Sequence, residues 1–152
     1  MRQNTGKIFL GTALGLTLFA GSLAAASHHS LNGTWTLQPT RSHFDGEPVI
    51  QTGSVTINDR EHNITVTRGF TYDGADQSFE YSFSTDGREN SSIHAGRSYK
   101  TKAKWEGNVL RVTTLDNGVS TVERYNLEPD GSLMLVVERG EHRPVTLFFQ
   151  RQ

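Results

Sequence analysis

The sequence from Leu31 to Gln152 predicts an all-β protein, an antiparallel up-and-down meander that closes into a barrel of about eight to ten strands. Short segments alternate apolar and polar residues with the period of two that is typical of a half-buried strand. Turn dipeptides such as Asp73-Gly74 and Asn117-Gly118 end these segments and supply residues that tolerate the backbone angles of tight hairpins. Because the connections are short, successive strands are expected to pair antiparallel.

Nine strands are predicted from these segments, with boundaries good to about two residues. They are Thr34–Gln38, Gln51–Asn58, Asn63–Phe70, Ser78–Ser84, Arg97–Trp105, Val109–Leu115, Ser120–Glu128, Leu133–Arg139 and Val145–Gln150. Two longer stretches, Pro39–Ile50 and Thr85–Gly96, are expected to be irregular, and both could act as lids over an open barrel end. A simpler alternative is that the apolar residues of the first stretch plug that end or cover Met134 and Phe148 on the outside.

The predicted sheet can be tested by asking whether one register per hairpin puts the apolar residues on one face. The register that does so pairs Ala103 with Leu110, Val112 with Tyr125, Leu127 with Leu133, Leu135 with Tyr125, and Leu133 with Phe149. The same face continues through Trp35, Leu37, Val55, Ile57, Ile64, Val66, Phe79, Tyr81 and Phe83. A sheet that is apolar on one side and has no helix to cover it must close or split in two. A barrel is therefore predicted, with a β-sandwich as the alternative.

The first 26 residues have the pattern of a signal peptide. Arg2 and Lys7 flank the start of an apolar run that is too short for a membrane-anchored helix, and small residues follow up to Ala26. Cleavage near Ala26 is expected to leave a flexible N-terminus at residues 27–32 and a single barrel domain at residues 33–152. Since the sequence has no cysteine, neither a lipoprotein anchor nor a disulfide is expected, and the predicted location is secreted or periplasmic in a bacterium.

The charge of the chain argues against a nucleic-acid partner, because the formal net charge is −1 even with Arg2 and Lys7 included. The face opposite the apolar one carries a basic stripe, defined as Arg97, Lys100, Lys102, Lys104, Arg111 and Arg124. This stripe could dock an anionic surface, but a solvated face that prevents edge pairing is the preferred interpretation. The mature protein is expected to be a monomer or weak dimer without a transmembrane segment.

Gly33-Thr34-Trp35 resembles the opening signature of the lipocalin and fatty-acid-binding-protein group of calycin-type barrels. The resemblance implies a lipocalin-like barrel in which Trp35 closes the floor beneath a basic side chain of the last strand, here Arg151. The second half of the chain, ending in Phe149-Gln150-Arg151, also looks like the closing strands of fatty-acid-binding proteins. A tighter resemblance is to small exported bacterial proteins that open with Gly-Thr-Trp and continue with Leu, a basic residue, Ser and Phe, here Leu37, Arg41, Ser42 and Phe44.

The chain departs from fatty-acid-binding proteins at two places. Those proteins insert a helix pair after the first strand, whereas this chain has only the stretch Pro39–Ile50. Their carboxylate clamp of two arginines and a tyrosine falls on Tyr125, Leu147 and Phe149. The resemblance therefore implies no arginine clamp for a fatty acid at the matched positions.

The barrel interior is the expected ligand site, because a barrel of this size leaves room for one small apolar molecule. The residues expected to line it are Arg68, Tyr81, Tyr99, Trp105, Tyr125 and Phe149. Glu123 would also face inward and need a partner, for which Arg68 is one candidate, and a bulge that exposes Glu123 is the other interpretation. The alternative to a ligand site is a barrel filled by its own side chains.

A metal site is suggested only at the predicted mature N-terminus. Cleavage after Ala26 makes His29 the third residue and cleavage after Ala25 makes His28 the third, and either arrangement can wrap Cu(II) or Ni(II) in a square plane. A polar tail without a role is the simpler interpretation. No arrangement of residues in the sequence indicates catalysis, and no cofactor is expected.

These observations predict an exported lipocalin-like protein that binds a small hydrophobic or amphipathic ligand in the barrel interior and is not an enzyme. The alternative is a barrel with a solid core that acts through its outer surface as an envelope interaction, inhibitor or scaffold module, for example through Met134 and Phe148.

Overall fold

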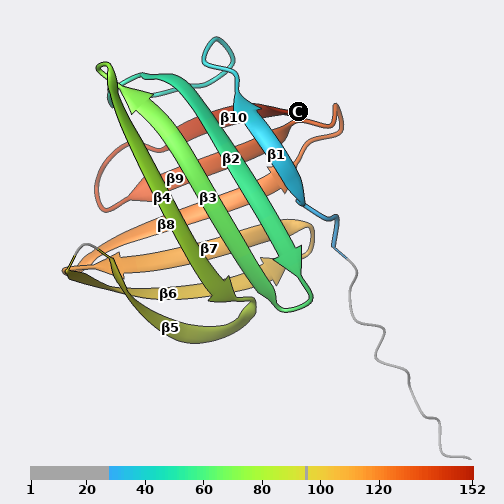
Figure 1. Ribbon diagram of the computed structural model, residues 1–152, viewed down its shortest axis with the longest axis vertical. Coiled ribbons are helices and arrows are strands. Elements are labelled where there is room, and N and C mark those ends of the chain that lie inside the picture. Colours follow the sequence, from blue (N-terminus) through green and yellow to red (C-terminus); the bar gives the residue numbers. More distant parts are fainter. Residues whose placement is uncertain (1–27, 95) are drawn as a thin grey trace, which may run out of the picture.

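The structure, a computed structural model, describes residues 28–94 and 96–152. The predicted signal peptide, residues 1–26, lies outside these residues. The described residues form ten β-strands and no helix (Figure 1). It follows that no helix in the described ranges is long and apolar enough to cross a membrane.

The ten strands follow one another as a meander. They are β1 (Gly33–Leu37), β2 (Ile50–Arg60), β3 (Asn63–Tyr72), β4 (Ala75–Ser84), β5 (Asp86–His94), β6 (Arg97–Glu106), β7 (Val109–Asp116), β8 (Val119–Leu127), β9 (Leu133–Arg139) and β10 (Val145–Arg151). Their order in the sheet is β4-β3-β2-β1-β10-β9-β8-β7-β6-β5, and every described pair is antiparallel. The predicted up-and-down topology is therefore confirmed.

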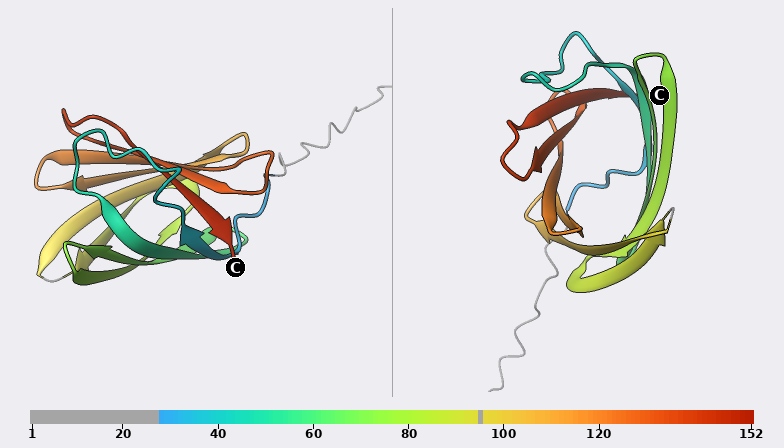
Figure 2. Two further views of the ribbon diagram at one scale, coloured as in Figure 1. Left: turned by 90° about the horizontal axis from the view of Figure 1, so that it is seen from above. Right: turned by 90° about the vertical axis from the view of Figure 1, so that its left-hand side faces the viewer.

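The sheet curves into a nearly closed barrel. Strand β1 pairs with both β2 and β10, which joins the two halves of the chain. The two ends of the sheet, β4 and β5, contact each other without forming a ladder, and the strands surround a common centre in both views of Figure 2. The fold is thus the predicted barrel and not the alternative sandwich.

The predicted inward face is confirmed, although two hairpin registers are wrong. Ala103 lies opposite Val112 and Leu110 lies opposite Tyr125, whereas the sequence analysis pairs Ala103 with Leu110 and Val112 with Tyr125. Each error is two residues, and a shift of two keeps every side chain on its face. The other three predicted pairs are confirmed. Phe79 has the inward parity that was predicted, but its side chain is 40% exposed.

The prediction that residues 85–96 are irregular is wrong, because most of them form β5. This strand reads Asp-Gly-Arg-Glu-Asn-Ser-Ser-Ile-His and has no alternation of apolar and polar residues. It pairs with β6 through Glu89 opposite Lys102 and Asn90 opposite Thr101, with an irregularity between Asp86 and Glu89. Main-chain pairing with β6, and not an apolar face, therefore defines the tenth strand.

The other long stretch, residues 38–49, is irregular as predicted and runs along β10. His43 exchanges backbone hydrogen bonds of 2.8 and 2.9 Å with Thr146. Ser42 Oγ donates to the Gln38 carbonyl and accepts from the Phe148 N–H. The Arg41 guanidinium lies 4.8 Å from the centre of the Phe148 ring. This segment consequently covers the outer face of Phe148, as the simpler alternative expects.

Candidate ligand site inside the barrel

Three of the six predicted lining residues meet in one cluster inside the barrel, together with Glu123. Arg68 lies on β3, Tyr81 on β4, and Glu123 and Tyr125 on β8. All four have the parity of buried apolar neighbours, so the alternation of the strands turns them inward. The ladder is continuous at Glu123, which pairs with Val112 on one side and Val137 on the other, so the alternative of a bulge is wrong.

The cluster, hereafter the Arg68–Glu123 cluster, is held by a two-pronged ion pair and two phenol groups. Arg68 Nη1 donates to Glu123 Oε1 at 2.8 Å and Nη2 donates to Oε2 at 2.5 Å. The Tyr125 hydroxyl donates to Oε2 at 3.0 Å, and the Tyr81 hydroxyl lies 3.2 Å from Oε2 and 3.0 Å from the Tyr125 hydroxyl. Arg68 Nη2 also donates to the Tyr125 oxygen. Bidentate pairs of this type fix geometry as well as charge.

Both members of the pair stay charged in spite of burial. Burial disfavours the charged form of Arg68, but attraction to Glu123 outweighs it and raises the pKa of Arg68. Burial likewise favours the neutral form of Glu123, but the charge and hydrogen bonds of Arg68 hold the pKa of Glu123 below its usual value. Burial raises the pKa of both Tyr81 and Tyr125, so their hydroxyls keep their protons. The cluster thus has no net charge.

The Arg68 guanidinium is also positioned by rings. Its central carbon lies 5.1 Å from the centre of the Tyr81 ring and 5.7 Å from that of Tyr125. Within the described part of the chain, Arg68 Nε is buried and has no hydrogen-bond partner. One N–H donor of the cluster is therefore left for another acceptor.

Apolar rings pack beside the cluster. Phe149, a predicted lining residue, is fully buried, and its ring centre lies 6.4 Å from that of Phe70. Phe70 lies opposite Gly53, where a β-carbon would overlap the Phe70 ring. Gly53 is thus required for the position of Phe70. Phe70 and its half-buried neighbour Tyr72 were not predicted as lining residues, although both continue the alternation of Val66 and Arg68.

Inward-facing side chains differ in exposure along the barrel. On the side of Trp35, the inward residues Leu110 and Leu133 have no exposed surface, while Trp105 and Leu127 are half-buried. Beyond the cluster lies the end formed by the turns at residues 73–74, 117–118 and 140–144, which we call the open end. Inward residues on this side are half-buried, namely Tyr72, Tyr99, Thr114, Thr121 and Val137. Solvent therefore reaches the inner surface from the open end, and Tyr99 lies there and not in the cluster.

The opposite end is closed by the residues that precede β1. Leu31 and Trp35 are fully buried, and the Leu31 carbonyl accepts a hydrogen bond of 3.0 Å from Trp35 Nε1. The Arg151 guanidinium lies 4.6 Å from the centre of the Trp35 ring and pairs with Trp35 across β1 and β10. The contact that the family resemblance implies between Trp35 and Arg151 is thus confirmed.

Trp105, a predicted lining residue, lies at the closed end and not in the Arg68–Glu123 cluster. His28 stacks on it with ring centres 3.6 Å apart, and His28 Nε2 lies 3.1 Å from a carboxylate oxygen of Asp59. The Asn32 side chain donates a hydrogen bond to the Asp59 carbonyl and accepts one from the Asp59 N–H. Residues 28–32, expected to be a flexible N-terminus, therefore contact the barrel.

The suggested copper or nickel site remains a prediction. It needs the free amine of residue 26 or 27, and both residues lie outside the described ones. His28 is engaged with Trp105 and Asp59, and His29 is exposed. Among the described residues, no cluster of His, Asp and Glu could hold a metal ion.

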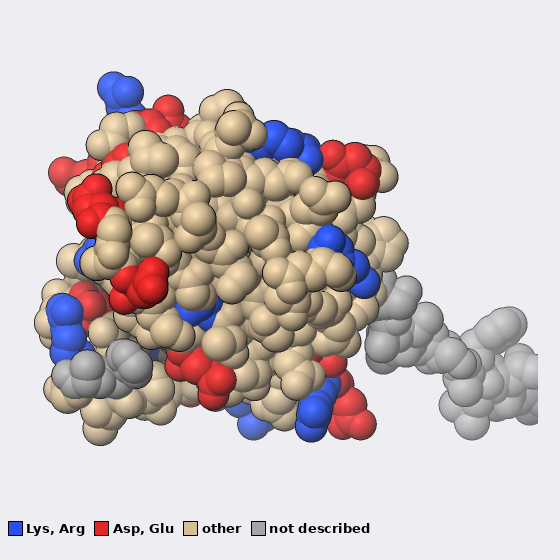
Figure 3. Space-filling view, turned by 45° about the horizontal axis from the view of Figure 1, so that its top comes forward, with Lys and Arg blue, Asp and Glu red and all other residues tan. Residues whose placement is uncertain are grey.

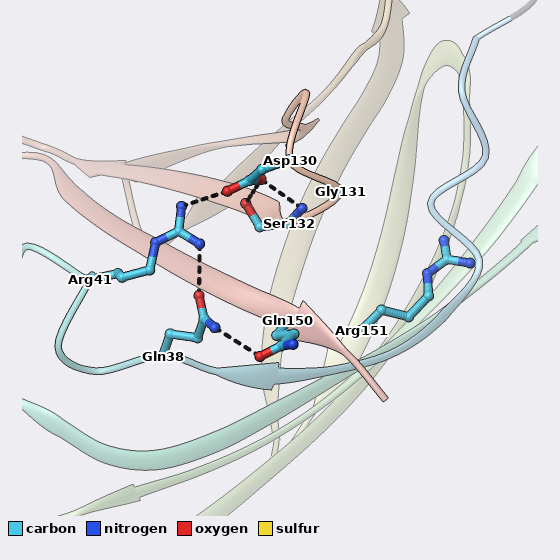
Figure 4. Close-up of a pocket in the computed structure, with 7 residues that line it drawn as sticks. All are labelled: Gln38, Arg41, Asp130, Gly131, Ser132, Gln150 and Arg151. Carbon is cyan, nitrogen blue, oxygen red and sulfur yellow. Dashed lines mark hydrogen bonds and ion pairs between the residues drawn. The ribbon is translucent and has the colours of Figure 1, made fainter.

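Two cavities in the described structure lie away from the cluster. One, of about 370 Å³, is lined by Val119, Gly140, Glu141 and His142 at the rim of the open end. The other, of about 330 Å³, lies on the outside (Figure 4) and is lined by Gln38, Arg41, Asp130, Gly131, Ser132, Gln150 and Arg151. In it Arg41 bridges Gln38 and Asp130, while Arg151 points away from the other six. Neither contains a predicted lining residue.

The basic stripe on the outer face is neutralised by acidic neighbours. Its ion pairs are Arg97–Asp116, Lys100–Glu89, Lys102–Glu89, Lys104–Glu106, Arg111–Glu106 and Arg124–Glu138, with N–O distances of 2.8 to 3.7 Å. On the face shown in Figure 3, acidic and basic side chains lie mainly toward the edges, around a largely uncharged centre. The ion pairs favour the solvated face over a docking surface for anions.

Solved structures with the same arrangement of strands were found by comparison. The fatty acid transporter REP1-NXSQ matches with a TM-score of 0.60 and 18% identity, over 80% of this chain and 96% of that chain. A fatty acid binding protein from Schistosoma mansoni, in complex with arachidonic acid, matches with a TM-score of 0.60 and 18% identity, over 80% and 95% of the two chains. The fold is calycin-like.

A further match is a secretory abundant heat soluble protein from Ramazzottius varieornatus, with a TM-score of 0.64 and 13% identity over 84% of this chain and 98% of that chain. No protein-family model and no curated protein sequence matches this chain. The predicted resemblance to the calycin group is confirmed for the fold. The three structural neighbours are named for transport, binding or heat solubility.

Proposed function

We propose that this protein is an exported, non-catalytic binding protein that holds a small hydrophobic or amphipathic molecule inside the barrel, between the open end and the Arg68–Glu123 cluster. The observation that carries the proposal is the partial exposure of inward-facing side chains beyond the cluster. A filled barrel would bury Phe79, Tyr99 and Val137 as completely as Leu110 and Leu133, yet Phe79 is 40% exposed and the other two are half-buried. The neighbours named for fatty acid transport and binding support the same proposal.

The physical basis of binding is the removal of apolar ligand surface from water. At about 25 cal/mol per Å², a ligand that buries about 300 Å² gains about 7 kcal/mol before the cost of its lost motion is subtracted. The half-buried rings of Tyr72 and Tyr99 and the exposed ring of Phe79 provide the complementary apolar surface. The cluster forms the deep limit of this surface and offers polar contacts that orient the ligand.

Export is supported by the N-terminal sequence alone. A basic start, a short apolar run and small residues up to Ala26 are the three parts of a signal peptide. The barrel is complete in the described residues without cysteine, so it needs no disulfide in an oxidising compartment. We propose the periplasm or the medium as its place of action, with a monomer or weak dimer as the working form. N-terminal sequencing of the mature protein and its mass in solution test both points.

The binding proposal is tested by native mass spectrometry of the protein purified from its own export compartment. The expected result is a co-purifying mass of lipid size, and titration with Nile red should then show saturable binding. The variant Thr121→Trp fills the inner surface at the open end and should weaken Nile red binding at least about tenfold. Thr113→Trp is the matched control, since Thr113 lies on the outer face of the neighbouring strand β7. Equal binding by both variants would contradict an interior site.

The second candidate is a barrel that acts through its outside. It is favoured by the position of the two cavities, which lie at the rim and on the outer surface. The outer pair Met134 and Phe148 is less suited to this role than expected, because Arg41 covers the Phe148 ring. Absence of Nile red binding together with a protein partner recovered by crosslinking in the periplasm would favour this candidate.

A further inference from the structure

We infer that the ligand of the interior site is an electrically neutral amphiphile whose polar end accepts a hydrogen bond, such as an alcohol or an ester, and not a carboxylate. The inference rests on the proposed function and specifies its ligand class. It follows from the composition of the Arg68–Glu123 cluster, which is the polar limit of the proposed site.

The positive charge of Arg68 is already matched inside the protein. Two parallel hydrogen bonds of 2.8 and 2.5 Å join its guanidinium to Glu123, and Tyr125 adds a third donor to the same carboxylate. The low pKa of Glu123 and the high pKa of Arg68 keep this pair ionised. A ligand carboxylate that approached Arg68 would therefore lie beside the carboxylate of Glu123. Two carboxylates that lie next to each other in a poorly solvated site repel each other.

The donors of the cluster indicate what it can accept. A guanidinium has five N–H donors, and the hydrogen bonds to Glu123 and Tyr125 use one of them on Nη1 and two on Nη2. Arg68 Nε is the buried donor for which the described residues supply no acceptor. The Tyr125 proton is directed to Glu123 and the Tyr81 hydroxyl is shared between Glu123 and Tyr125. A neutral oxygen that accepts from Arg68 satisfies a remaining N–H donor without adding charge.

The wild-type protein tests this inference with three ligands that share one alkyl chain: dodecanol, methyl dodecanoate and dodecanoic acid. Displacement of Nile red is measured at neutral pH, where the free acid is ionised. The alcohol and the ester are expected to bind at least about tenfold more tightly than the acid. Equal or tighter binding of the acid would overturn the inference and leave the proposed function standing. If none of the three ligands nor Nile red binds, the proposed function itself fails.

A charge-changing variant reports on the cluster directly. Glu123→Gln keeps the size and one acceptor oxygen but leaves the Arg68 charge unmatched. The ratio of its affinity for dodecanoate to its affinity for methyl dodecanoate is expected to rise at least about tenfold over the same ratio in the wild type. An unchanged ratio in a folded variant would contradict a role of Glu123 in excluding carboxylates.

A second measurement needs no variant and holds even if Glu123→Gln does not fold. Dodecanoic acid labelled with ¹³C at its carboxyl carbon is added to the wild-type protein in excess, and the chemical shift of the bound carboxyl is followed with pH. The expected result is a bound acid that keeps its proton to a higher pH than the free acid does. A bound carboxyl that is ionised at neutral pH would show that the site accepts carboxylates and would overturn the inference.

Discussion

At the scale of single residues, the barrel holds two opposite full charges among apolar and aromatic side chains. Arg68 and Glu123 have side chains that are only 12% and 11% exposed. A pair of this kind gives little net stability compared with apolar residues, but the loss of one member leaves a buried charge without a partner. The inward orientation of both side chains could be predicted from the alternation of the strands. The distance between the two side chains could not be predicted, because it depends on how the barrel brings β3 and β8 to face each other.

Replacing one member of the Arg68–Glu123 ion pair should destabilise the fold far more than replacing both members. Glu123→Leu is expected to lower the free energy of unfolding by about 3–5 kcal/mol, because it leaves the Arg68 guanidinium buried alone. The double variant R68M/E123L should recover most of that loss, since two apolar residues then pack together. Urea unfolding of the wild type, both single variants and the double variant measures the difference. A single variant as stable as the double variant would contradict a buried, mutually dependent pair.

Gly53 and Gly69 provide a second, matched test. A β-carbon at Gly53 overlaps the Phe70 ring, while one at Gly69 meets only Ser54 Oγ at 3.7 Å. Gly53→Ala is therefore expected to cost about 1–3 kcal/mol of stability through overpacking. Gly69→Ala in the neighbouring strand should be neutral or slightly stabilising, because it restricts the unfolded chain. Thermal unfolding of the two variants under identical conditions makes the comparison, and equal midpoints would argue against the ring position described here.

At the scale of elements, the strands with clear alternation were predicted and the polar strand was missed. Strands β8 and β9 carry Tyr125, Leu133 and Leu135 at alternate positions, and these residues are fully buried. In β5, by contrast, Ile93 is 79% exposed, and the strand forms because β6 offers it an edge. A single-sequence pattern reports side-chain burial, so it cannot detect a strand stabilised mainly by its backbone.

Strand β5 should accordingly open more readily than a strand with a buried apolar face, such as β9. Its second edge faces β4 without a ladder, and it buries little apolar surface. Local opening needs less free energy where few apolar contacts are lost. Hydrogen–deuterium exchange is expected to be at least about 100-fold faster for amides of β5 than for those of β9. Uniform protection across the two strands would show that β5 is stabilised by contacts not evident in its exposure.

At the scale of the whole molecule, the closed barrel and its inner face followed from the alternation pattern and the lack of helical segments. The register of β6 with β7 and of β7 with β8 did not, because shifts of two residues leave the same faces buried. Packing at the closed end, where Leu31 and His28 lie against Trp35 and Trp105, was also not foreseen. The residues before β1 carry no periodic signal that would reveal such contacts.

The pH dependence of stability is a property of the whole barrel that follows from its buried tyrosines. Burial raises the pKa of Tyr81 and Tyr125 above the ordinary tyrosine value of 10.0. Their contribution is complete below pH 10 and is lost as the pH rises toward the folded pKa values, because the unfolded chain then releases protons that the folded protein holds. Glu123 acts in the opposite direction and destabilises the fold as the pH falls below its unfolded value near 4.5.

Thermal unfolding across alkaline pH tests the tyrosine contribution. The midpoint is expected to fall steeply above pH 10 in the wild type, together with the appearance of phenolate absorbance on unfolding. Tyr81→Phe removes one of the two groups and should make this fall less steep. A wild-type unfolding midpoint that stays constant from pH 9 to pH 12 would contradict the burial of these hydroxyls.

The pairing of β1 with β10 has a consequence for biosynthesis. The side chains of Thr36 and Gln152 share a hydrogen bond across 116 positions of the chain, and Trp35 stands opposite Arg151. Such distant partners make the closing step slow relative to the formation of local hairpins. If the chain is exported as we propose, its first strand emerges from the translocon long before its second neighbour and presents a bare backbone edge. Nascent molecules would then depend on chaperones outside the translocon until the final strand arrives, and truncated products would be prone to edge-to-edge aggregation.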